Sequence, residues 1–318
     1  MPYWVWLGSI EEGLCYGLTA LGIYITFRIL NMPDLTVDGT FPLGAATAAA
    51  LITKGVTPLA STAVALAAGC AGGLLTGFLH TKLRITGLLA GILSMSALYS
   101  LNLRIMGRSN VPLLRHPTIF RQLEDAGVPY DYVELLVFGV VIVVALSFLH
   151  WFLRTEVGHA LRATGDNAQM IQSLGVNTGT MKVLGLALAN GFVALSGALL
   201  AQSQGYADAG MGIGMIVAGL ASVIIGEALF RPSGILTSLL AVVLGSIVYR
   251  LAILIALRSG FAPTDLKIIT ALLVILALST PALKDHLAAY RRRRAVQVGH
   301  QEKGKAAHAP VTARPKDL

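Results

Sequence analysis

The chain has 318 residues, of which 55% are hydrophobic and only 13% are charged, whereas soluble domains carry about 25% charged residues. With a mean hydropathy of +0.72 and a formal net charge of +8, this composition excludes an ordinary soluble enzyme or binding module. It predicts an all-α, polytopic transmembrane helical bundle, because a helix needs about 20 apolar residues to cross a bilayer.

The first segment begins with the sequence MPYWVW. It has neither a basic start nor a small-residue cleavage site, so it does not resemble a removable signal peptide. We instead expect Tyr3, Trp4 and Trp6 to anchor the chain at the membrane interface. Glu11 and Glu12 follow early in the same segment, where acids are costly and usually functional.

Nine apolar runs follow one another along the chain, and one of them is short. They cover residues 8–30, 41–53, 58–80, 85–105, 132–152, 181–203, 214–230, 235–255 and 266–283. Small residues are frequent in them, which lets helix backbones approach closely. No polar stretch between the runs is long enough to build its own core, so residues 1–290 are expected to form one membrane domain.

The short run, residues 41–53, spans about 20 Å as a helix, against about 30 Å for the hydrocarbon core. We therefore expect at least one broken or re-entrant helix, the kind of segment that places transporter sites at membrane depth. The run is preceded by the sequence DGT, in which Asp38 or Thr40 can cap the helix, and Pro42 lies in the first turn.

Two interpretations remain open for the residues before this short helix. In the first, the helix N-terminus faces a cavity and attracts a substrate carboxylate, while Asp34 or Asp38 binds an ammonium group. In the second, residues 31–38 form a surface turn and Asp38 is only a cap. Under the first interpretation, the candidate pathway residues are Asp34, Thr36, Asp38 and Thr40.

Lys and Arg near the segment ends predict the orientation, because cytoplasmic loops carry an excess of them. The turn at 82–84, the polar stretch 154–182 and the C-terminal tail can share one side by simple alternation, and this side is expected to be the cytoplasm. The loop 104–128 holds four arginines and then lies outside, against the usual bias. The side of the N-terminus depends on whether residues 41–53 cross.

The basic excess is concentrated in the tail. From Lys284 onward, nine Lys and Arg face three acids, which leaves fifteen against thirteen in the rest of the chain. The run Arg291 to Arg294 resembles a nucleic-acid patch, but its position after an apolar run favours a cytoplasmic stop signal beside anionic lipid. We expect residues 291–318 to form a basic, disordered cytoplasmic tail and expect no nucleic-acid partner.

No enzyme active site is expected. The Gly304-Lys305 pair is followed by Ala306, so the chain lacks a GxxxxGK[ST] phosphate loop. The seven histidines show no HExxH or paired spacing of a zinc site. Cys15 and Cys70 lie among apolar residues without CxxC spacing, so we expect buried, inert thiols and neither a metal nor a cofactor.

Three stretches carry a resemblance to a known family. They are GHALRA at 158–163 with LGVN at 174–177, PDLTVDGTF at 33–41, and VIIGE at 223–227. The chain resembles the permeases of ATP-binding-cassette importers of the branched-chain amino-acid and ribose type. Within them it is similar to a branch paired with binding proteins for aromatic amino acids. The likeness covers residues 8 to 283, nearly all the membrane part.

The resemblance implies a transport mechanism in the bacterial inner membrane. Two permease copies, as a homodimer, form a central pathway, an extracytoplasmic binding protein delivers a small solute such as an amino acid, and two cytoplasmic ATPase subunits grip an elbow at residues 156–177. ATP-driven movement of the elbow then switches the access of the pathway. The implied coupling residues are Gly158, Arg162, Gly165, Asp166, Asn167, Leu174 and Gly175.

Other interpretations remain. Taken alone, residues 156–177 can be a connecting loop with a helical turn or two, bounded by Gly165 and Gly175, and they lack the Glu-Ala-Ala form seen in other importer classes. An ion-coupled secondary transporter is the main alternative function, and acids inside the bilayer would favour it. A membrane-embedded enzyme would need a catalytic constellation that the sequence does not offer.

Overall fold

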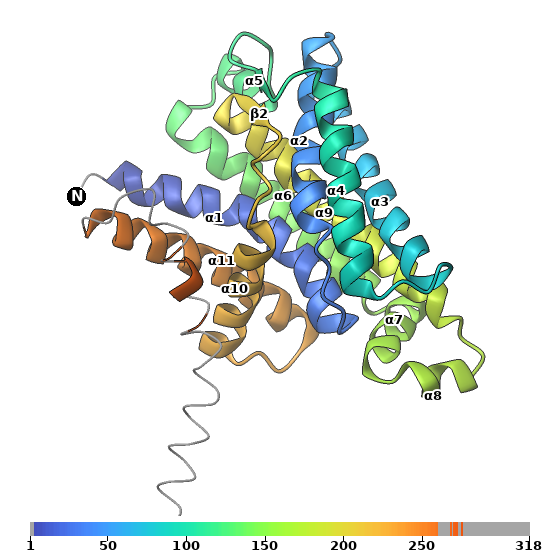
Figure 1. Ribbon diagram of the computed structural model, residues 1–318. Coiled ribbons are helices and arrows are strands. Elements are labelled where there is room, and N and C mark those ends of the chain that lie inside the picture. The colour runs from blue at the N-terminus through green and yellow to red at the C-terminus, as the bar shows by residue number, and fades with distance from the viewer. Residues whose placement is uncertain (1–2, 260–267, 269, 273–274, 276–318) are drawn as a thin grey trace, which may run out of the picture. The chain divides into compact units, whose positions relative to one another are not determined.

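The computed structural model describes residues 3–259, 268, 270–272 and 275. The chain divides into two compact units, Met1–Val274 and Ile275–Leu318. Ile275 is the described part of the second unit, so the tail expected at 291–318 lies outside the described residues, as does most of the run 266–283. The helices and strands named below belong to the first unit (Figure 1).

The N-terminal helix continues directly into a π-helix. α1 spans Tyr3–Ile23 and η1, the π-helix, spans Tyr24–Ile29. Asn31 then adopts a left-handed backbone conformation, with a φ of 51°, which Asn tolerates better than most residues. The chain is consequently non-helical from Asn31 until α2 begins, and α2 spans Val37–Thr53.

α2 is the predicted short helix, and it has 17 residues. α3, Pro58–Thr81, returns alongside it. The hydroxyl oxygens of Thr36 and Thr76 lie 2.8 Å apart, so the start of α2 lies beside the end of α3. α2 therefore runs from one end of the bundle to the other, with non-helical residues completing the crossing.

The next elements build the two ends of the bundle. α4 spans Gly87–Met106 and α6 spans Tyr130–Phe152. Between them lie the strand β1, Asn110–Pro112, and the short helix α5, Ile119–Asp125. β1 pairs antiparallel with β2, Tyr206–Asp208, which fixes the end of the chain's sixth apolar run beside the α4–α6 loop.

The predicted elbow consists of two short helices. α7 spans Glu156–Asp166, α8 spans Ala168–Ser173, and α9, Thr178–Gln204, follows. In Figure 1, α7 and α8 lie at the same end of the bundle as the α3–α4 turn, and Lys182 Nζ is 3.5 Å from His80 Nε2. Within the described residues, the basic segments assigned to the cytoplasm therefore share one end.

A second break lies near the end of the described chain. After β2, residues 209–214 form turns and lead into α10, Met215–Phe230, which has only 16 residues. α11 follows at Ile235–Arg258. The sequence leaves residues 204–213 outside the apolar runs 181–203 and 214–230, but it predicts a broken helix only for the run 41–53. Non-helical backbone inside a membrane bundle persists only where protein buries it or where it lines a water-filled cavity.

α9 is the central helix. The most apolar part of α9 is 78% buried, against 28–44% for α3, α4, α6 and α11. Small residues bring α2 and α3 onto it, because a side chain at Gly44 would collide with the carbonyl of Ala194, and one at Gly73 with that of Leu186. The close helix approach expected from the small residues is thus present in the core.

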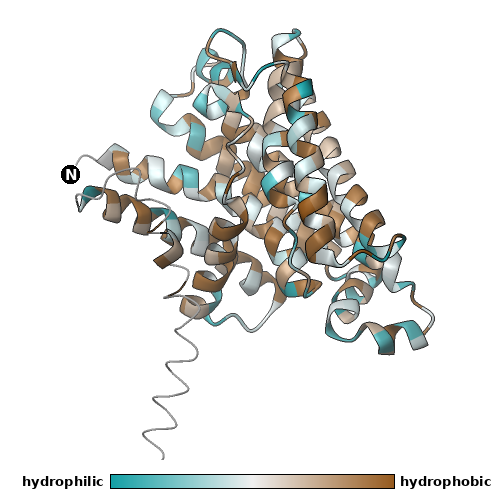
Figure 2. Ribbon diagram, viewed as in Figure 1, coloured by the Kyte–Doolittle hydropathy of each residue, from teal (hydrophilic) through white to brown (hydrophobic). Residues whose placement is uncertain are grey.

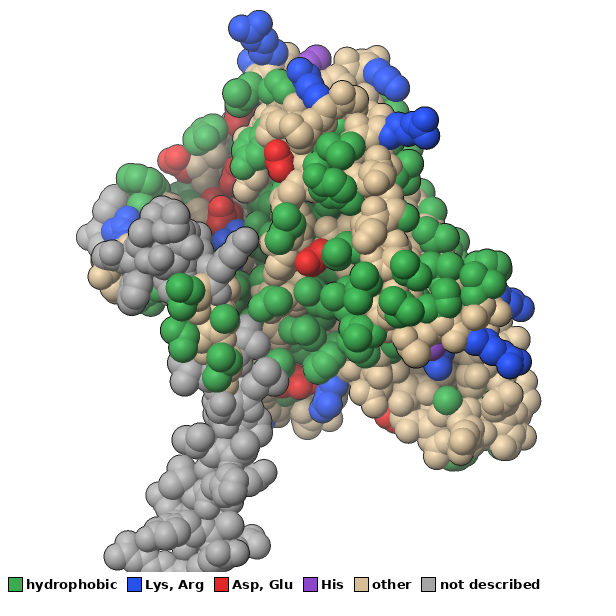
Figure 3. Space-filling view, in the orientation of Figure 1, with side chains coloured by type: hydrophobic (Ala, Val, Ile, Leu, Met, Phe, Trp, Pro, Cys, Tyr) green, Lys and Arg blue, Asp and Glu red, His purple; other side chains and the backbone are tan. Residues whose placement is uncertain are grey.

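The surface is that of a membrane protein. Among the described residues, five helices are long and apolar enough to cross a membrane, namely α3, α4, α6, α9 and α11. Large apolar side chains such as Leu59, Leu88 and Val143 are exposed on α3, α4 and α6, and Figure 2 shows hydrophobic residues along these helices. Lys and Arg gather toward the two ends (Figure 3). The predicted polytopic helical bundle is confirmed.

Candidate functional site

A buried polar seam joins α2 to α9. Asn190 Nδ2 donates to Asp34 Oδ2 at 2.7 Å, and Asn190 Oδ1 accepts from the hydroxyl of Thr40 at 2.7 Å. Asp34 Oδ1 also accepts from the backbone N–H of Thr36 at 2.9 Å. These four residues are at most 2% exposed. The surface-turn interpretation is therefore wrong for Asp34, which holds the start of α2 against α9.

Asp38 caps a helix other than its own. Its carboxylate accepts backbone N–H groups from Gly214 at 3.1 Å and from Ile216 at 2.9 Å, at the start of α10. No side chain caps α2, whose N-cap residue is Thr36. The prediction that Asp38 or Thr40 caps its own helix is therefore wrong, because the carboxylate instead stabilises the positive end of α10.

A cavity of about 480 Å³ lies beside the break before α10. Its lining includes Tyr16, Gly214, Met215, Tyr249, Arg250 and Ile253. Arg250 of α11 forms an ion pair with Glu12 of α1, in which Nη2 and Oε2 are 3.1 Å apart. The same guanidinium lies 4.0 Å from the centroid of the Tyr16 ring. Apolar and aromatic walls with a few placed polar groups are typical of small-molecule sites.

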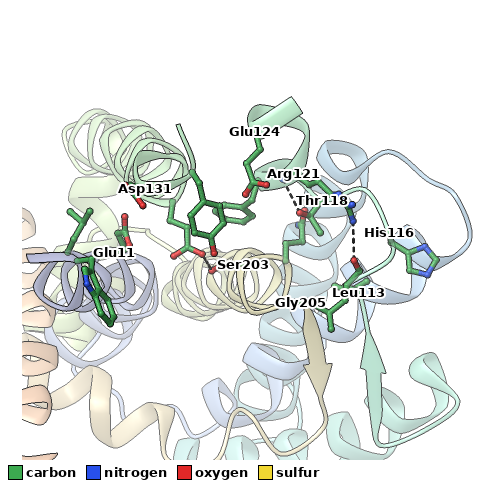
Figure 4. A pocket seen from close by; sticks show the side chains of 16 residues that line it. Glu11, Leu113, His116, Thr118, Arg121, Glu124, Asp131, Ser203 and Gly205 are labelled. Atoms are coloured by element: carbon green, nitrogen blue, oxygen red, sulfur yellow. Dashed lines mark hydrogen bonds between the residues drawn. The ribbon is translucent and has the colours of Figure 1, made fainter. Parts of the chain in front are cut away.

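A second cavity, of about 530 Å³, opens at the end of the bundle where α5 and β1 lie (Figure 4). Its lining includes the acidic side chains of Glu11, Glu124, Asp131 and Glu134, together with His116 and Arg121. Ser203 donates to Glu134 Oε1 at 2.6 Å, whereas the buried Glu11 Oε1 has no hydrogen-bond partner within the described part of the chain. This cavity is an acidic vestibule at the end opposite the elbow.

The elbow is shaped by side chains that cap its helices. Thr155, Asn167 and Asn177 precede α7, α8 and α9, and each accepts a backbone N–H in the first turn at 3.0–3.2 Å. Gly175 has a φ of 88°, which lets the chain leave α8 without Cβ strain. Asn167 and Gly175, two of the predicted coupling residues, therefore determine the backbone of the elbow.

The other predicted coupling residues lie in two places. Some lie where α7 packs on the bundle, which we call the seat of the elbow, and others lie toward its exposed end, which we call the tip. Side chains at Gly158 and Gly165 would collide with the carbonyls of Phe152 and Ile29, so these glycines seat α7 on the bundle. Arg162 is half-buried, and Asp166 is exposed. At the tip, Met170 and Leu174 on and after α8 are 59% and 69% exposed.

The seat of the elbow adjoins an ion pair. Arg28 Nε lies 3.0 Å from Glu227 Oε1, which joins η1 to the last turn of α10. Ile29, whose carbonyl contacts Gly165, is the next residue along η1. Two consecutive residues of η1 therefore contact α7 and α10.

Sequence reasoning missed Asn190, Met170 and Arg250. Arg250 interrupts the apolar run 235–255, and a charge inside a membrane segment is itself a signal of function. Asn190 is likewise a polar residue within an apolar run. Their partners, Glu12 and Asp34, are distant in the chain, so only the folded bundle shows which groups meet.

The chain is similar in sequence to known transport permeases. Residues 7–278 match a family model described as the permease component of the branched-chain amino acid transport system. A tyrosine transport system permease protein of Clostridioides difficile is 44% identical over 281 residues, which cover 88% of this chain and 92% of that protein. An uncharacterised protein of Rickettsia prowazekii is 35% identical, over 87% of this chain and 98% of its own length.

A more distant relative is also an importer permease. The autoinducer 2 import system permease protein LsrC of Yersinia pestis is 25% identical over 210 residues, which cover 66% of this chain and 58% of that protein. The family resemblance seen in the elbow and in residues 33–41 is confirmed. The chain belongs to the family of permease components of branched-chain amino acid transport systems.

Proposed function

We propose that this permease imports an aromatic amino acid and is driven through its elbow by separate ATPase subunits. As a member of its family, the chain is the membrane-spanning subunit of an ATP-driven importer and a multi-pass protein of the bacterial inner membrane. The name of the C. difficile relative, a tyrosine transport permease, supports the choice of cargo, and so do the aromatic walls of the cavity beside α10.

The exposed elbow is the observation that carries the coupling proposal. The sequence has no phosphate loop, and the family works with ATP-binding and substrate-binding partner subunits. Met170 and Leu174 expose apolar surface at the end assigned to the cytoplasm, where such surface marks an interaction site. With the exposed Asp166 and half-buried Arg162, these side chains form the contact for the ATPase.

The same contacts describe how the elbow acts on the pathway. α7 rests on Ile29, the adjacent Arg28 pairs with Glu227 at the end of α10, and Asp38 holds the start of α10. Movement of α7 therefore shifts α10 and the break before it, which borders the 480 Å³ cavity. This shift switches the access of the pathway.

Two copies of the chain surround one pathway in this proposal. Glu12 on α1 pairs with Arg250 on α11, and Arg28 on η1 pairs with Glu227 near the end of α10, whereas α3, α4 and α6 expose large apolar side chains that suit lipid. Charged groups at membrane depth face a bundle interior or a cavity, so α1, α10 and α11 face the pathway. Asp34, Thr36, Asp38 and Thr40 then position its walls.

The double variant Met170→Glu, Leu174→Glu tests the elbow. In membranes that contain the ATPase and binding-protein subunits, we expect the ATPase to stop co-purifying and substrate uptake to fall at least about tenfold, because a central apolar contact is lost. Leu83→Glu is the control, since Leu83 is 56% exposed in the α3–α4 turn at the same end.

Retained co-purification and uptake in the double variant would contradict the proposed elbow contact. Equal losses in Leu83→Glu would show that added charge, and not the elbow, causes the effect. Uptake that continues after deletion of the ATPase subunits would instead favour an ion-coupled transporter.

A further inference from the structure

Glu12 and Arg250 lie more than two turns away from the ends of their helices. Glu12 is nine residues after the start of α1 and Arg250 is eight residues before the end of α11, which is about 12–14 Å from the nearer helix end at 1.5 Å per residue. The two helices pack along this length, since the hydroxyl of Ser246 donates to the carbonyl of Gly13 at 2.7 Å. Charges at this depth are costly and are retained mainly where they serve a substrate or ion.

Arg250 borders a cavity of the size that small ligands occupy, and Glu12 lies behind it as its ion-pair partner. The volume of about 480 Å³ falls within the 300–1,000 Å³ range of small-molecule pockets. Tyr249 is 4% exposed and lines the wall next to Arg250, while Met215 and Ile253 provide apolar surface. Arg250 lines the cavity and its side chain is 20% exposed, while its partner Glu12, 3.1 Å away, has a side chain that is 45% exposed.

Arg250 is the group beside this cavity that suits an anion. The N-terminus of α10 also borders it, but the carboxylate of Asp38 already occupies the N–H groups of Gly214 and Ile216. A guanidinium has five N–H donors, and Glu12 contacts the guanidinium at Nη2. Arg250 can therefore bind a ligand carboxylate while it stays beside Glu12.

We propose that Glu12, Tyr16, Tyr249 and Arg250 form a substrate site for an aromatic amino acid in its zwitterionic form. This assignment rests on the proposed amino-acid import. Arg250 binds the α-carboxylate through two parallel N–H donors, and Glu12 binds the α-ammonium. The side-chain ring of the ligand packs against Tyr249, Met215 and Ile253 of the cavity lining, where an aromatic contact with Tyr249 is favourable, while Tyr16 holds the guanidinium of Arg250.

Glu12 also explains how Arg250 is stabilised when no ligand is bound. An isolated Arg at this depth would need a partner, and Glu12 provides it at 3.1 Å. The arriving zwitterion brings one charge of each sign, so the net charge of the pair stays at zero when the ligand binds beside it. The Tyr16 ring, 4.0 Å from the guanidinium carbon, keeps Arg250 at the cavity wall by a cation–π contact.

Equilibrium binding of radiolabelled tyrosine tests the site directly. The sample is the permease with its ATPase subunits in lipid nanodiscs, without the binding protein. We expect Arg250→Gln and Glu12→Gln each to raise the Kd for tyrosine at least about tenfold, since each removes one charge-assisted contact. Arg258→Gln is the matched control, because Arg258 lies on the same helix and outside the cavity.

Competition on the wild type tests the two ends of the ligand. Tyramine lacks the carboxylate and N-acetyltyrosine lacks the ammonium, so both are expected to compete at least about tenfold more weakly than tyrosine. If Arg250→Gln does not assemble, Arg250→Lys replaces it. Lys keeps the charge and the partner Glu12 but lacks the paired donors, so weaker tyrosine binding is again expected.

The proposal is overturned if Arg250→Gln, or Arg250→Lys in its place, binds tyrosine as the wild type does, or if tyramine competes as well as tyrosine. Absence of tyrosine binding to the wild type at about 1 mM also overturns it. Tyrosine uptake by the complete importer is measured in parallel. Uptake without binding would overturn this site alone, whereas the absence of any ATP-dependent amino-acid uptake would overturn the proposed function.

Discussion

The carboxylate of Asp38 accepts N–H groups from Gly214 and Ile216, which lie 176 and 178 residues further along the chain. The first turn of a helix has N–H groups without partners inside the helix, and a bilayer has no water to satisfy them. A single side chain from α2 thus stabilises the break before α10. The seam of Asp34, Thr40 and Asn190 holds α2 itself in place.

Replacing Asp38 should weaken this part of the bundle. We expect Asp38→Ala to destabilise the protein by about 2 kcal/mol or more, because two buried N–H groups lose their acceptor. Asp38→Asn keeps one acceptor oxygen and should have a smaller effect. Thermal unfolding of the purified protein in detergent measures both, with the exposed Asp166→Ala as control. Equal unfolding temperatures for Asp38→Ala and the control would contradict the cap.

The helix α7 depends on a close approach to η1. A Cβ at Gly165 would collide with the carbonyl of Ile29, and Leu161 on the same helix is fully buried. A large or charged side chain at position 165 would therefore disturb the packing of α7 as well as any contact with the ATPase. Gly165→Ala adds only a methyl group, so it tests the packing of α7 on η1 and leaves the exposed tip of the elbow unaltered.

Gly165→Ala is expected to lift α7 from η1. Uptake and ATPase stimulation by the substrate-loaded binding protein should fall together, by about tenfold for a loss of about 1.4 kcal/mol in the coupled state, while the ATPase still co-purifies. Gly139→Ala on α6 is the control, because no atom lies within 4 Å of a Cβ at that position. Wild-type coupling in Gly165→Ala would rule out the seat as a transmission point.

In the first unit, Met1–Val274, some helices expose apolar side chains and others are joined by ion pairs, and the elbow and the acidic vestibule lie at opposite ends. α3, α4 and α6 expose apolar side chains, whereas one ion pair joins α1 to α11 and another joins η1 to α10. α1 leads into η1, which contacts the elbow, so the start of α1 lies at the opposite end. If the elbow is cytoplasmic, as we propose, we expect the N-terminus and the acidic vestibule to be extracytoplasmic.

Thiol labelling tests this orientation in whole cells. In a background with Cys15→Ala and Cys70→Ala, a membrane-impermeant maleimide should label Leu114→Cys in intact cells, because Leu114 is 75% exposed near the acidic vestibule. Leu174→Cys, at the 69% exposed elbow tip, should react only after permeabilisation. The reverse pattern would invert the topology.

Composition and periodic apolar runs were enough to predict a helical membrane protein, because each run must bury its backbone polar groups in a helix. Motifs at 33–41 and 158–177 indicated the family and the elbow. Neither could show that Asp38 caps α10 or that Arg250 meets Glu12, because these partners are brought together only by packing between distant helices. The way in which the break before α10 is stabilised was likewise not visible in the sequence, since its acceptor lies on α2.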